Sequence, residues 1–274
     1  MEMVLVDIRD KEFMEFSDYI RINFGINLTE QKKNLLVSRL NSVLLKGNFE
    51  SFEDYFHYLI SDRSGFAVSE LVDKITTNHT YFYREKKHFD FFVKEALPFF
   101  TENNEERDIR IWSAGCSSGE EPYSIAMALD QYFGNQKLFW DTKILATDLS
   151  QDALSKATEG VYKKDNIKNL PVAWQHKYFK KISDDQYRIS EVLKKEVIYR
   201  RLNLMSRFNF KRKFHIIFCR NVMIYFNDET THRIVRKFYD ALEDGGYLFI
   251  SHSESLDRRK TKLKYIKPAI YRKE

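Results

Sequence analysis

The segment RIWSAGCSSGEEPYSIAMAL, residues 110–129, constrains the fold of this chain more than any other stretch. It reads as a buried strand, a turn of small residues from Ser113 to Gly119, and a helix from Pro122 onward. A strand that breaks into a Gly/Ser turn and restarts as a helix brings backbone N–H groups close to a ligand. The alternative is an ordinary strand–turn–helix connection, because small-residue turns also occur without a ligand.

The residues of this turn are unsuited to phosphate. The turn is not G-x-G-x-x-G, and no Lys follows it as in a P-loop. Instead, Glu120 and Glu121 follow Gly119 directly. Carboxylates repel a phosphate group, whereas they attract an ammonium group and accept hydrogen bonds from hydroxyls. The turn therefore favours an aminoacyl-bearing nucleoside such as S-adenosylmethionine over a nucleoside triphosphate.

Composition excludes several classes of protein. No apolar run approaches the roughly 20 residues needed to cross a bilayer, and the acidic N-terminus does not resemble a signal peptide. The two cysteines, Cys116 and Cys219, indicate neither a disulfide framework nor a zinc site. We expect a cytoplasmic protein with reduced thiols and no metal. Residues 1–75 hold 9 basic and 13 acidic side chains against 45 and 40 in the whole chain, so the remainder carries about +9. No nucleic-acid-binding motif accompanies that charge.

Residues 1–75 are predicted to form a small helical domain. Apolar spacing indicates a helix over 11–24, a second from Thr29 to Gly47, a third from Ser51 and a fourth over 69–76. The segment 76–90 is rich in Thr, Asn and aromatic residues rather than Gly and Ser, so we expect it to pack against a domain and not to act as a free linker.

Residues 91–274 are predicted to form an α/β domain. Strand candidates alternate with helical segments such as 150–157 and 228–242, which favours a mostly parallel sheet covered on both faces. The strand candidates are 109–113, 143–147, 198–203, 215–219 and 247–251, with a last strand at 269–272. Two alternating segments, 178–181 and 186–189, flank the polar turn Ser183–Asp185. They predict an antiparallel hairpin within an inserted β-subdomain at about 165–200.

Polar side chains follow three of these strands, where α/β sheets bind ligands. Asp148 ends the second strand and could accept hydrogen bonds from ribose hydroxyls, or could cap the helix that starts near Ser150. Arg220 follows a buried strand, and a buried guanidinium needs partners. Asn203 and Leu204 suit an adenine edge and face, although a plain loop explains them as well.

The segment TTNHTYFYRE, residues 76–85, is dense in polar groups and aromatic rings. If it is helical, Thr80 and Arg84 share one face. The alternative is that the aromatic residues belong to the core and that Arg84 is solvated.

Taken together, the chain resembles the CheR-type chemotaxis receptor methyltransferases. The resemblance rests on five motifs in family order, and it spans nearly the whole chain: TTNHTYFYRE, SAGCSSGEEPYSIA, ATDLSQDALSKA, CRNVMIYF and GGYLFISHSES. It implies a Rossmann-like S-adenosylmethionine-dependent methyltransferase domain with a small antiparallel β-subdomain, preceded by an all-helical domain that docks on the receptor. It also implies transfer of a methyl group to glutamate side chains on the cytoplasmic helices of chemoreceptors.

The resemblance further implies roles for single residues. Cofactor contacts would come from the interdomain segment, the turn and the strand ends: Asn78, Thr80, Arg84, Gly115, Glu121, Asp148, Asn203, Leu204, Cys219, Arg220 and Asn221. The catalytic set would be Arg84, Arg220 and Tyr225, in which the two arginines orient carboxylates and the Tyr225 hydroxyl positions the substrate glutamate. No general base is needed, because a glutamate with a pKa of about 4.3 is already ionised near neutral pH.

Partner recognition is predicted for one helix face. Lys32, Arg39 and Lys46 recur at seven-residue steps and form one stripe in an otherwise acidic domain. The stripe would match an acidic receptor helix, although a solvated face explains it equally well. Some members of the family hold a C-terminal receptor pentapeptide on a Gly-rich hairpin turn. The turn here has no Gly, so we expect this chain not to use that tether.

Two other classes of function stay open: an S-adenosylmethionine-binding sensor or scaffold without activity, and a nucleic-acid methyltransferase. The presence of Arg84, Arg220 and Tyr225 disfavours a sensor. The Asn/Asp-Pro-Pro-Tyr segment of amino-directed DNA methylases is missing, with residues 220–223 in its place. We therefore expect no nucleic-acid partner, no insertion into a membrane, and a monomer.

Overall fold

The structure is a computed structural model that describes residues 6–102 and 105–274. The chain divides into two compact units. The first contains residues up to Thr77 together with Tyr225–Asn227, and the second contains Asn78–Ile224 and Asp228–Glu274.

The first unit is helical, as its apolar spacing predicts. It consists of α1 (Asp10–Phe24), the short 3₁₀ helix η1 (Glu30–Lys32), α2 (Lys33–Gly47), α3 (Phe52–Ser61) and α4 (Phe66–Ile75). Local signals set the helix ends: Gly25 ends α1 in the left-handed conformation, and the Ser51 side chain accepts a hydrogen bond from the Asp54 amide at the start of α3. Phe16 and Leu40 are fully buried in its core.

The second unit is built on a seven-stranded sheet in the order β6-β2-β1-β7-β8-β10-β9. The strands β6, β2, β1, β7 and β8 run parallel, and β10 and β9 add an antiparallel edge. Their bounds are β1 (Ile111–Ala114), β2 (Ile144–Asp148), β6 (Val197–Arg201), β7 (Phe214–Phe218), β8 (Leu242–Phe249), β9 (Lys264–Lys267) and β10 (Ile270–Arg272).

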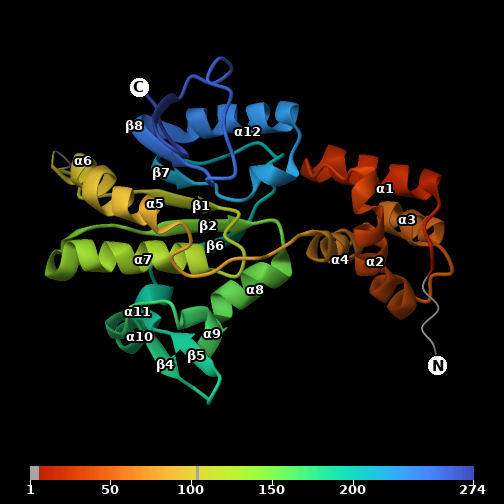
Figure 1. Cartoon of the computed structure of the whole chain (residues 1–274), viewed down its shortest axis with the longest axis horizontal. Helices are drawn as coiled ribbons and strands as arrows, with labels where there is room; N and C mark the ends of the chain where they lie inside the picture. The colour runs from red at the N-terminus through yellow and green to blue at the C-terminus, as the bar shows by residue number, and fades with distance from the viewer. Residues whose placement is uncertain (1–5, 103–104) are drawn as a thin grey trace. The chain divides into compact units, whose positions relative to one another are not determined.

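Helices cover both faces of this sheet, with α7 (Glu120–Phe133) on one side and α12 (Asp228–Ala241) on the other (Figure 1). All four residues of β1 are buried, as expected for a parallel strand with both faces covered. Trp112 packs against Phe238 of α12 with ring centroids 5.3 Å apart. Its neighbour Ile111 points to the opposite face and joins the core that includes Tyr123 of α7.

The other helices of the second unit are shorter. They are α5 (Lys86–Phe91), the π-helical turn η2 (Phe92–Ala96), α6 (Leu97–Thr101), η3 (Gly134–Phe139), α8 (Gln151–Glu159), α9 (Lys164–Ile167), α10 (Val172–Tyr178), α11 (Glu191–Lys194) and η4 (Met223–Tyr225), whose last residue belongs to the first unit.

A separate three-stranded antiparallel sheet, in the order β3-β5-β4, interrupts the alternation. The hairpin pairs β4 (Phe179–Lys181) with β5 (Gln186–Ile189), as the sequence indicates. The third strand, β3 (Val161–Lys163), is too short to show a pattern, and pairing with β5 defines it. Tyr162 and Phe179 turn their rings toward the core.

The predicted fold class is confirmed: an all-helical N-terminal domain, a Rossmann-like methyltransferase domain, and a small antiparallel sheet. The helix considered as one possibility for segment 76–85 does not form. Residues 78–85 are not helical, and the helix α5 begins only at Lys86. Tyr83 and Glu85 both adopt positive φ angles, which a helix does not allow.

Candidate active site

The strand order reverses beside the first strand of the sheet. From β1 the chain builds outward through β2 and β6, then returns to add β7 and β8 on the other side. The carboxyl ends of β1 and β7 therefore lie at the point where the strand order reverses. Ligands of open α/β sheets bind at this point, because the loops on either side separate there.

The turn between β1 and α7 is shaped by two glycines with positive φ angles, Gly115 at 85° and Gly119 at 96°. The amides of Gly115 and Cys116 both donate to the Thr147 carbonyl, at 2.7 and 2.9 Å, which fixes the turn against β2. A Cβ added at Gly115 would lie 2.3 Å from the Val222 Cγ2 atom. The close approach of the turn to the loop after β7 therefore requires glycine.

Asp148 ties the end of β2 to this turn. Its carboxylate accepts hydrogen bonds from the amides of Ser117, at 2.8 Å, and Ser150, at 2.9 Å. The Ser150 hydroxyl, not Asp148, caps α8 by accepting from the Ala153 amide. Ser150 therefore fills the capping role that was considered for Asp148. Asp148 itself lies at the end of β2, next to the turn between β1 and α7.

Glu121 lies in the first turn of α7 with its carboxylate inside the protein. It accepts a hydrogen bond from the Ser113 hydroxyl at 2.7 Å and pairs with the Arg220 guanidinium at 3.4 Å. Burial raises the pKa of Glu121, and the nearby positive charge of Arg220 opposes that rise. Burial likewise raises the pKa of its neighbour Glu120, which accepts a hydrogen bond from the Ser118 hydroxyl.

Arg220 follows β7 and is the buried cation of the site, with 2% of its side chain exposed. Its Nε atom lies 3.2 Å from a Glu85 carboxylate oxygen, and its Nη2 atom donates to the Arg84 carbonyl. The guanidinium also lies 5.7 Å from the centre of the Phe89 ring. With Glu121 included, two carboxylates compensate one buried guanidinium, as a buried charge requires.

The segment before α5 reaches this site through its backbone. The Arg84 side chain donates to the His79 carbonyl at 2.8 Å and lies over the Tyr81 ring, so it is folded back on its own segment. The Tyr83 amide donates to the Ser124 hydroxyl of α7 at 3.0 Å. Asn78 is exposed and Thr80 half-buried, and within residues 6–102 and 105–274 neither side chain makes a hydrogen bond. The aromatic residues divide: Phe82 is core, while Tyr81 is exposed.

The four remaining predicted contacts, Asn203, Leu204, Cys219 and Asn221, are hydrogen-bonded or buried within the protein. Asn203 accepts from the Met205 amide at 2.9 Å. The Asn221 amide group donates to the Ser251 hydroxyl at 2.8 Å. Cys219 is fully buried, and burial raises the pKa of its thiol well above the usual range. Leu204 is also buried, and its carbonyl accepts from Lys237.

Comparison with known proteins identifies the family. Residues 78–271 match the family described as "CheR methyltransferase, SAM binding domain", and residues 11–76 match "CheR methyltransferase, all-alpha domain". The chain belongs to the CheR methyltransferase family. It is therefore an S-adenosylmethionine-dependent protein-glutamate methyltransferase.

Named relatives agree with this assignment over nearly their whole length. A chemotaxis protein methyltransferase of Borreliella burgdorferi is 47% identical over 272 residues, which cover 98% of this chain and 96% of the relative. Chemotaxis protein methyltransferase 2 of Vibrio cholerae is 35% identical, with coverage of 92% and 88%. A chemotaxis protein methyltransferase of Listeria monocytogenes is 32% identical, with coverage of 90% and 91%.

The site residues fit the chemistry of the cofactor that the family uses. The Asp148 carboxylate at the tip of β2 suits hydroxyl donors, and the acidic first turn of α7 suits an ammonium group. The Ser117 hydroxyl is buried in the turn and has no hydrogen-bond partner in the part of the chain that the structure describes. Buried polar groups are rarely left unpaired, so this hydroxyl points to a ligand at the turn. No helix within the described residues is long and apolar enough to span a bilayer.

The remaining predicted residues of this CheR family member lie in the first unit. The Tyr225 carbonyl accepts from the Asn27 amide at 2.8 Å, and the Lys32 Nζ atom lies 6.0 Å from the centre of the Tyr225 ring. Arg39 donates to the Ile75 carbonyl at 2.6 Å and thereby holds the carboxyl end of α4. Lys46 is exposed at the end of α2. Among the three cations of the stripe, Arg39 therefore also has a structural role within the first unit.

Sequence reasoning missed three residues that hold the predicted site residues or their loop in place. Ser113 supports Glu121, and Glu85 supports Arg220. Glu254 is half-buried and accepts hydrogen bonds from the amides of Ser251 and Asn221, which holds the loop after β7. Ser113, Glu85 and Glu254 all lie inside motifs that carry the family resemblance. A search of those motifs for buried polar residues could have found them, although spacing alone could not show their partners.

Proposed function

We propose that this enzyme methylates glutamate side chains on the cytoplasmic helices of chemoreceptors, in the cytoplasm and as a monomer. The observation that carries the proposal is the buried Arg220 between Glu85 and Glu121, where the strand order reverses beside β1. A guanidinium in this place presents planar donors to a carboxylate, and a carboxylate occurs both in the substrate and in the methyl donor.

The chain's own residues supply alignment rather than proton transfer. S-adenosylmethionine, when bound, supplies a methyl group already activated by its sulfonium charge. Asp148 would hold the ribose hydroxyls and Glu121 the methionine end, while Arg84 and Arg220 orient carboxylates. Because an acceptor glutamate is ionised near pH 7, the site needs no general base. Correct alignment of reactants can supply roughly 7–11 kcal/mol of the barrier.

Further contacts follow from the resemblance and belong to the same proposal. Segment 76–90 would lend Asn78 and Thr80 to the cofactor, since their side chains have no hydrogen-bond partner within the described residues. Asn203 and Leu204 would line the adenine. Cys219 would lie below the reacting methyl group. Its buried thiol stays neutral and therefore adds no competing nucleophile there.

The first unit is proposed as the receptor-docking domain. Lys32, Arg39 and Lys46 supply positive charge in a domain that is otherwise acidic. Arg39 also holds the end of α4, so Lys46 is the cleaner probe of docking. Charge on this face would steer an acidic receptor helix and lose strength as salt rises.

Independence from a receptor C-terminal tether is proposed from the hairpin turn. Residues 182–185 join β4 to β5 and contain no glycine, and Lys181 pairs with Asp184 across the turn at 2.8 Å. This short, ion-paired turn offers little backbone to a peptide. Calorimetric titration of the protein with a receptor C-terminal pentapeptide should show no heat of binding; measurable affinity would overturn this part of the proposal.

The decisive experiment measures transfer of radiolabelled methyl from S-adenosylmethionine to receptor cytoplasmic fragments. Glutamate methyl esters hydrolyse in base, so label on a fragment that base releases supports the proposal. Label that resists base would indicate another acceptor and contradict it. If cofactor binds in a calorimeter but no receptor of the host accepts a methyl group, the proposed receptor substrate is wrong.

A further inference from the structure

Glu85 occupies a conformation that a glutamate seldom adopts. Its φ angle is 58°, in the left-handed region, where a residue with a side chain is disfavoured by roughly 1–2 kcal/mol. Residues in such conformations persist when their surroundings over-determine them. The contacts of the Glu85 carboxylate, which is only 15% exposed, supply that constraint.

Three donors reach the two oxygens of this carboxylate, and the His88 ring lies beside it. One oxygen accepts from the Ser251 hydroxyl at 2.8 Å and the His252 amide at 3.1 Å. The other accepts from Arg220 Nε at 3.2 Å and faces His88 Nδ1 at 3.1 Å. Burial alone would raise the pKa of Glu85, but these donors lower it well below its usual range. Glu85 is therefore a charged hub between its own segment, the loop after β8 and Arg220.

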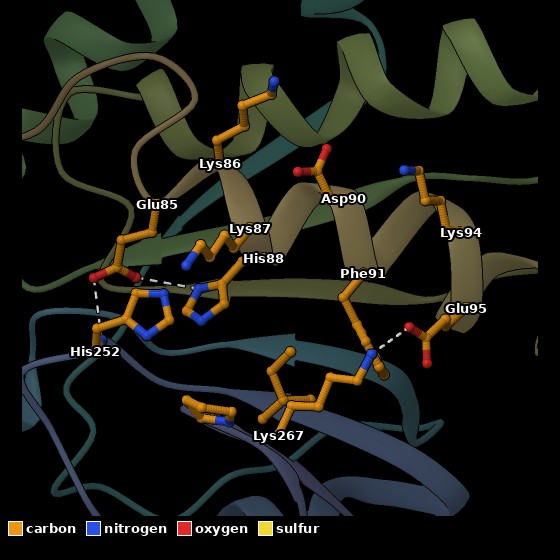
Figure 2. Close-up of a pocket in the computed structure, with 12 residues that line it drawn as sticks. Glu85, Lys86, Lys87, His88, Asp90, Phe91, Lys94, Glu95, His252 and Lys267 are labelled. Atoms are coloured by element: carbon orange, nitrogen blue, oxygen red, sulfur yellow. Dashed lines mark hydrogen bonds and ion pairs between the residues drawn. The ribbon is translucent and has the colours of Figure 1, made fainter.

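The same neighbourhood has the makings of a metal site, since Glu85, His88 and His252 place potential ligand atoms within 4.8 Å of one another (Figure 2). The Glu85 contacts disfavour that use. Both of its oxygens already accept hydrogen bonds, and one contacts a guanidinium that would repel a cation. The adjoining pocket is also rimmed by four lysines: Lys86, Lys87, Lys94 and Lys267.

We propose that Glu85 is a positioning residue for methyl transfer, which acts by holding the Arg220 guanidinium in the plane that receives a carboxylate. Arg220 has three partners: the Arg84 carbonyl, Glu121 and Glu85. Glu121 belongs to the proposed cofactor contacts, whereas Glu85 approaches the Nε edge and leaves the Nη edge to other partners. This inference rests on the proposed role of Arg220 in the reaction.

The test is a double-mutant cycle between Glu85 and Arg220, with methyl transfer to a receptor fragment as the readout. Glu85→Gln keeps the side chain's shape and removes its charge. It should lower kcat/KM by about 10- to 100-fold, as expected when a catalytic group is misplaced. In an Arg220→Met background the same change should have an effect of less than about twofold, because no guanidinium is left to position. Glu95→Gln is the matched control: Glu95 pairs with Lys267 at the far end of the same pocket (Figure 2) and should keep wild-type rates.

Thermal melts of each variant separate positioning from folding. An equal loss of activity from Glu85→Gln in both backgrounds, with a lower melting temperature, would assign Glu85 a structural role and overturn the proposal. Wild-type-like rates of Glu85→Gln in an active preparation would also overturn it. A wild-type enzyme that transfers no methyl group would instead refute the proposed function. Finally, wild-type activity should survive EDTA; loss with EDTA and recovery with Zn²⁺ would show a metal site in place of the hub.

Discussion

Replacement of Gly115 by alanine should strain the turn between β1 and α7. A second substitution, at Val222, should relieve part of that strain. The φ angle of 85° lies in the left-handed region, which costs a residue with a side chain roughly 1–2 kcal/mol. The new Cβ would also lie 2.3 Å from the Val222 Cγ2 atom, so one of the two must move. Overpacking of this kind costs typically about 1–3 kcal/mol. The expected loss in the free energy of unfolding is therefore about 2–5 kcal/mol.

Val222→Ala removes the methyl group that clashes. Val222 is half-buried, so truncation by itself should cost about 1 kcal/mol. In the double variant only the backbone strain of residue 115 remains. The two changes should therefore be non-additive, with a favourable coupling of about 1–3 kcal/mol.

Urea denaturation of wild type, both single variants and the double variant measures this coupling. Unchanged m-values would show that the native and unfolded states keep their exposed surfaces, so that shifts in midpoint report stability. Additivity to within about 0.5 kcal/mol would refute the clash argument. A loss below about 1 kcal/mol for Gly115→Ala would refute the strain argument as well. Gly65→Ala is the control for a left-handed φ alone, because its φ is 77° and no atom lies within 4 Å of its Cβ position.

Three other predictions concern pH, turnover and docking. Burial and the nearby Arg110 charge lower the pKa of His215 from 6.5 to about 4. The unfolded chain thus binds an extra proton between these values, and stability falls as pH drops from about 6.5 to about 4. The shift corresponds to about 3 kcal/mol, which partial exposure reduces to about 1–2 kcal/mol; His215→Asn should flatten this difference in urea titrations, and an unchanged profile would exclude His215 as its source. Tyr225→Phe should lower turnover while leaving cofactor affinity in calorimetry nearly unchanged, and equal losses in both would refute a positioning role. Lys46→Glu should weaken receptor methylation and its salt dependence without changing the melting temperature, whereas Arg39→Glu should also lower that temperature because it releases the end of α4; wild-type rates for Lys46→Glu would exclude the docking stripe.

Much of the fold follows from short-range patterns. Apolar spacing located the four helices of the first unit, and the alternation of buried runs with amphipathic segments indicated a covered parallel sheet. These patterns hold because burial of one face is a local property of an element. The strand β3 escaped detection because three residues carry no period, and its pairing with β5 is set by residues more than twenty positions away.

The segment before α5 shows where local reasoning fails. Its spacing allowed a helix with Thr80 and Arg84 on one face, yet the chain takes positive φ angles at Tyr83 and Glu85 instead. Tertiary contacts outweigh helix propensity here: Tyr83 stacks on Phe89 with centroids 4.3 Å apart, and Glu85 accepts hydrogen bonds from the loops after β7 and β8.

The sequence by itself determined the chemistry that is available at the site. It placed acids after a small-residue turn and an arginine after a buried strand, and its motifs identified the family. Only the tertiary structure decided which of these groups are partners, because hydrogen bonds and ion pairs form between residues far apart in the chain. Arg220 and Glu85 are separated by 135 residues, and no periodicity relates them. Their pairing exists because the order of the strands brings the end of β7 to the segment before α5, where a buried guanidinium must find an anion.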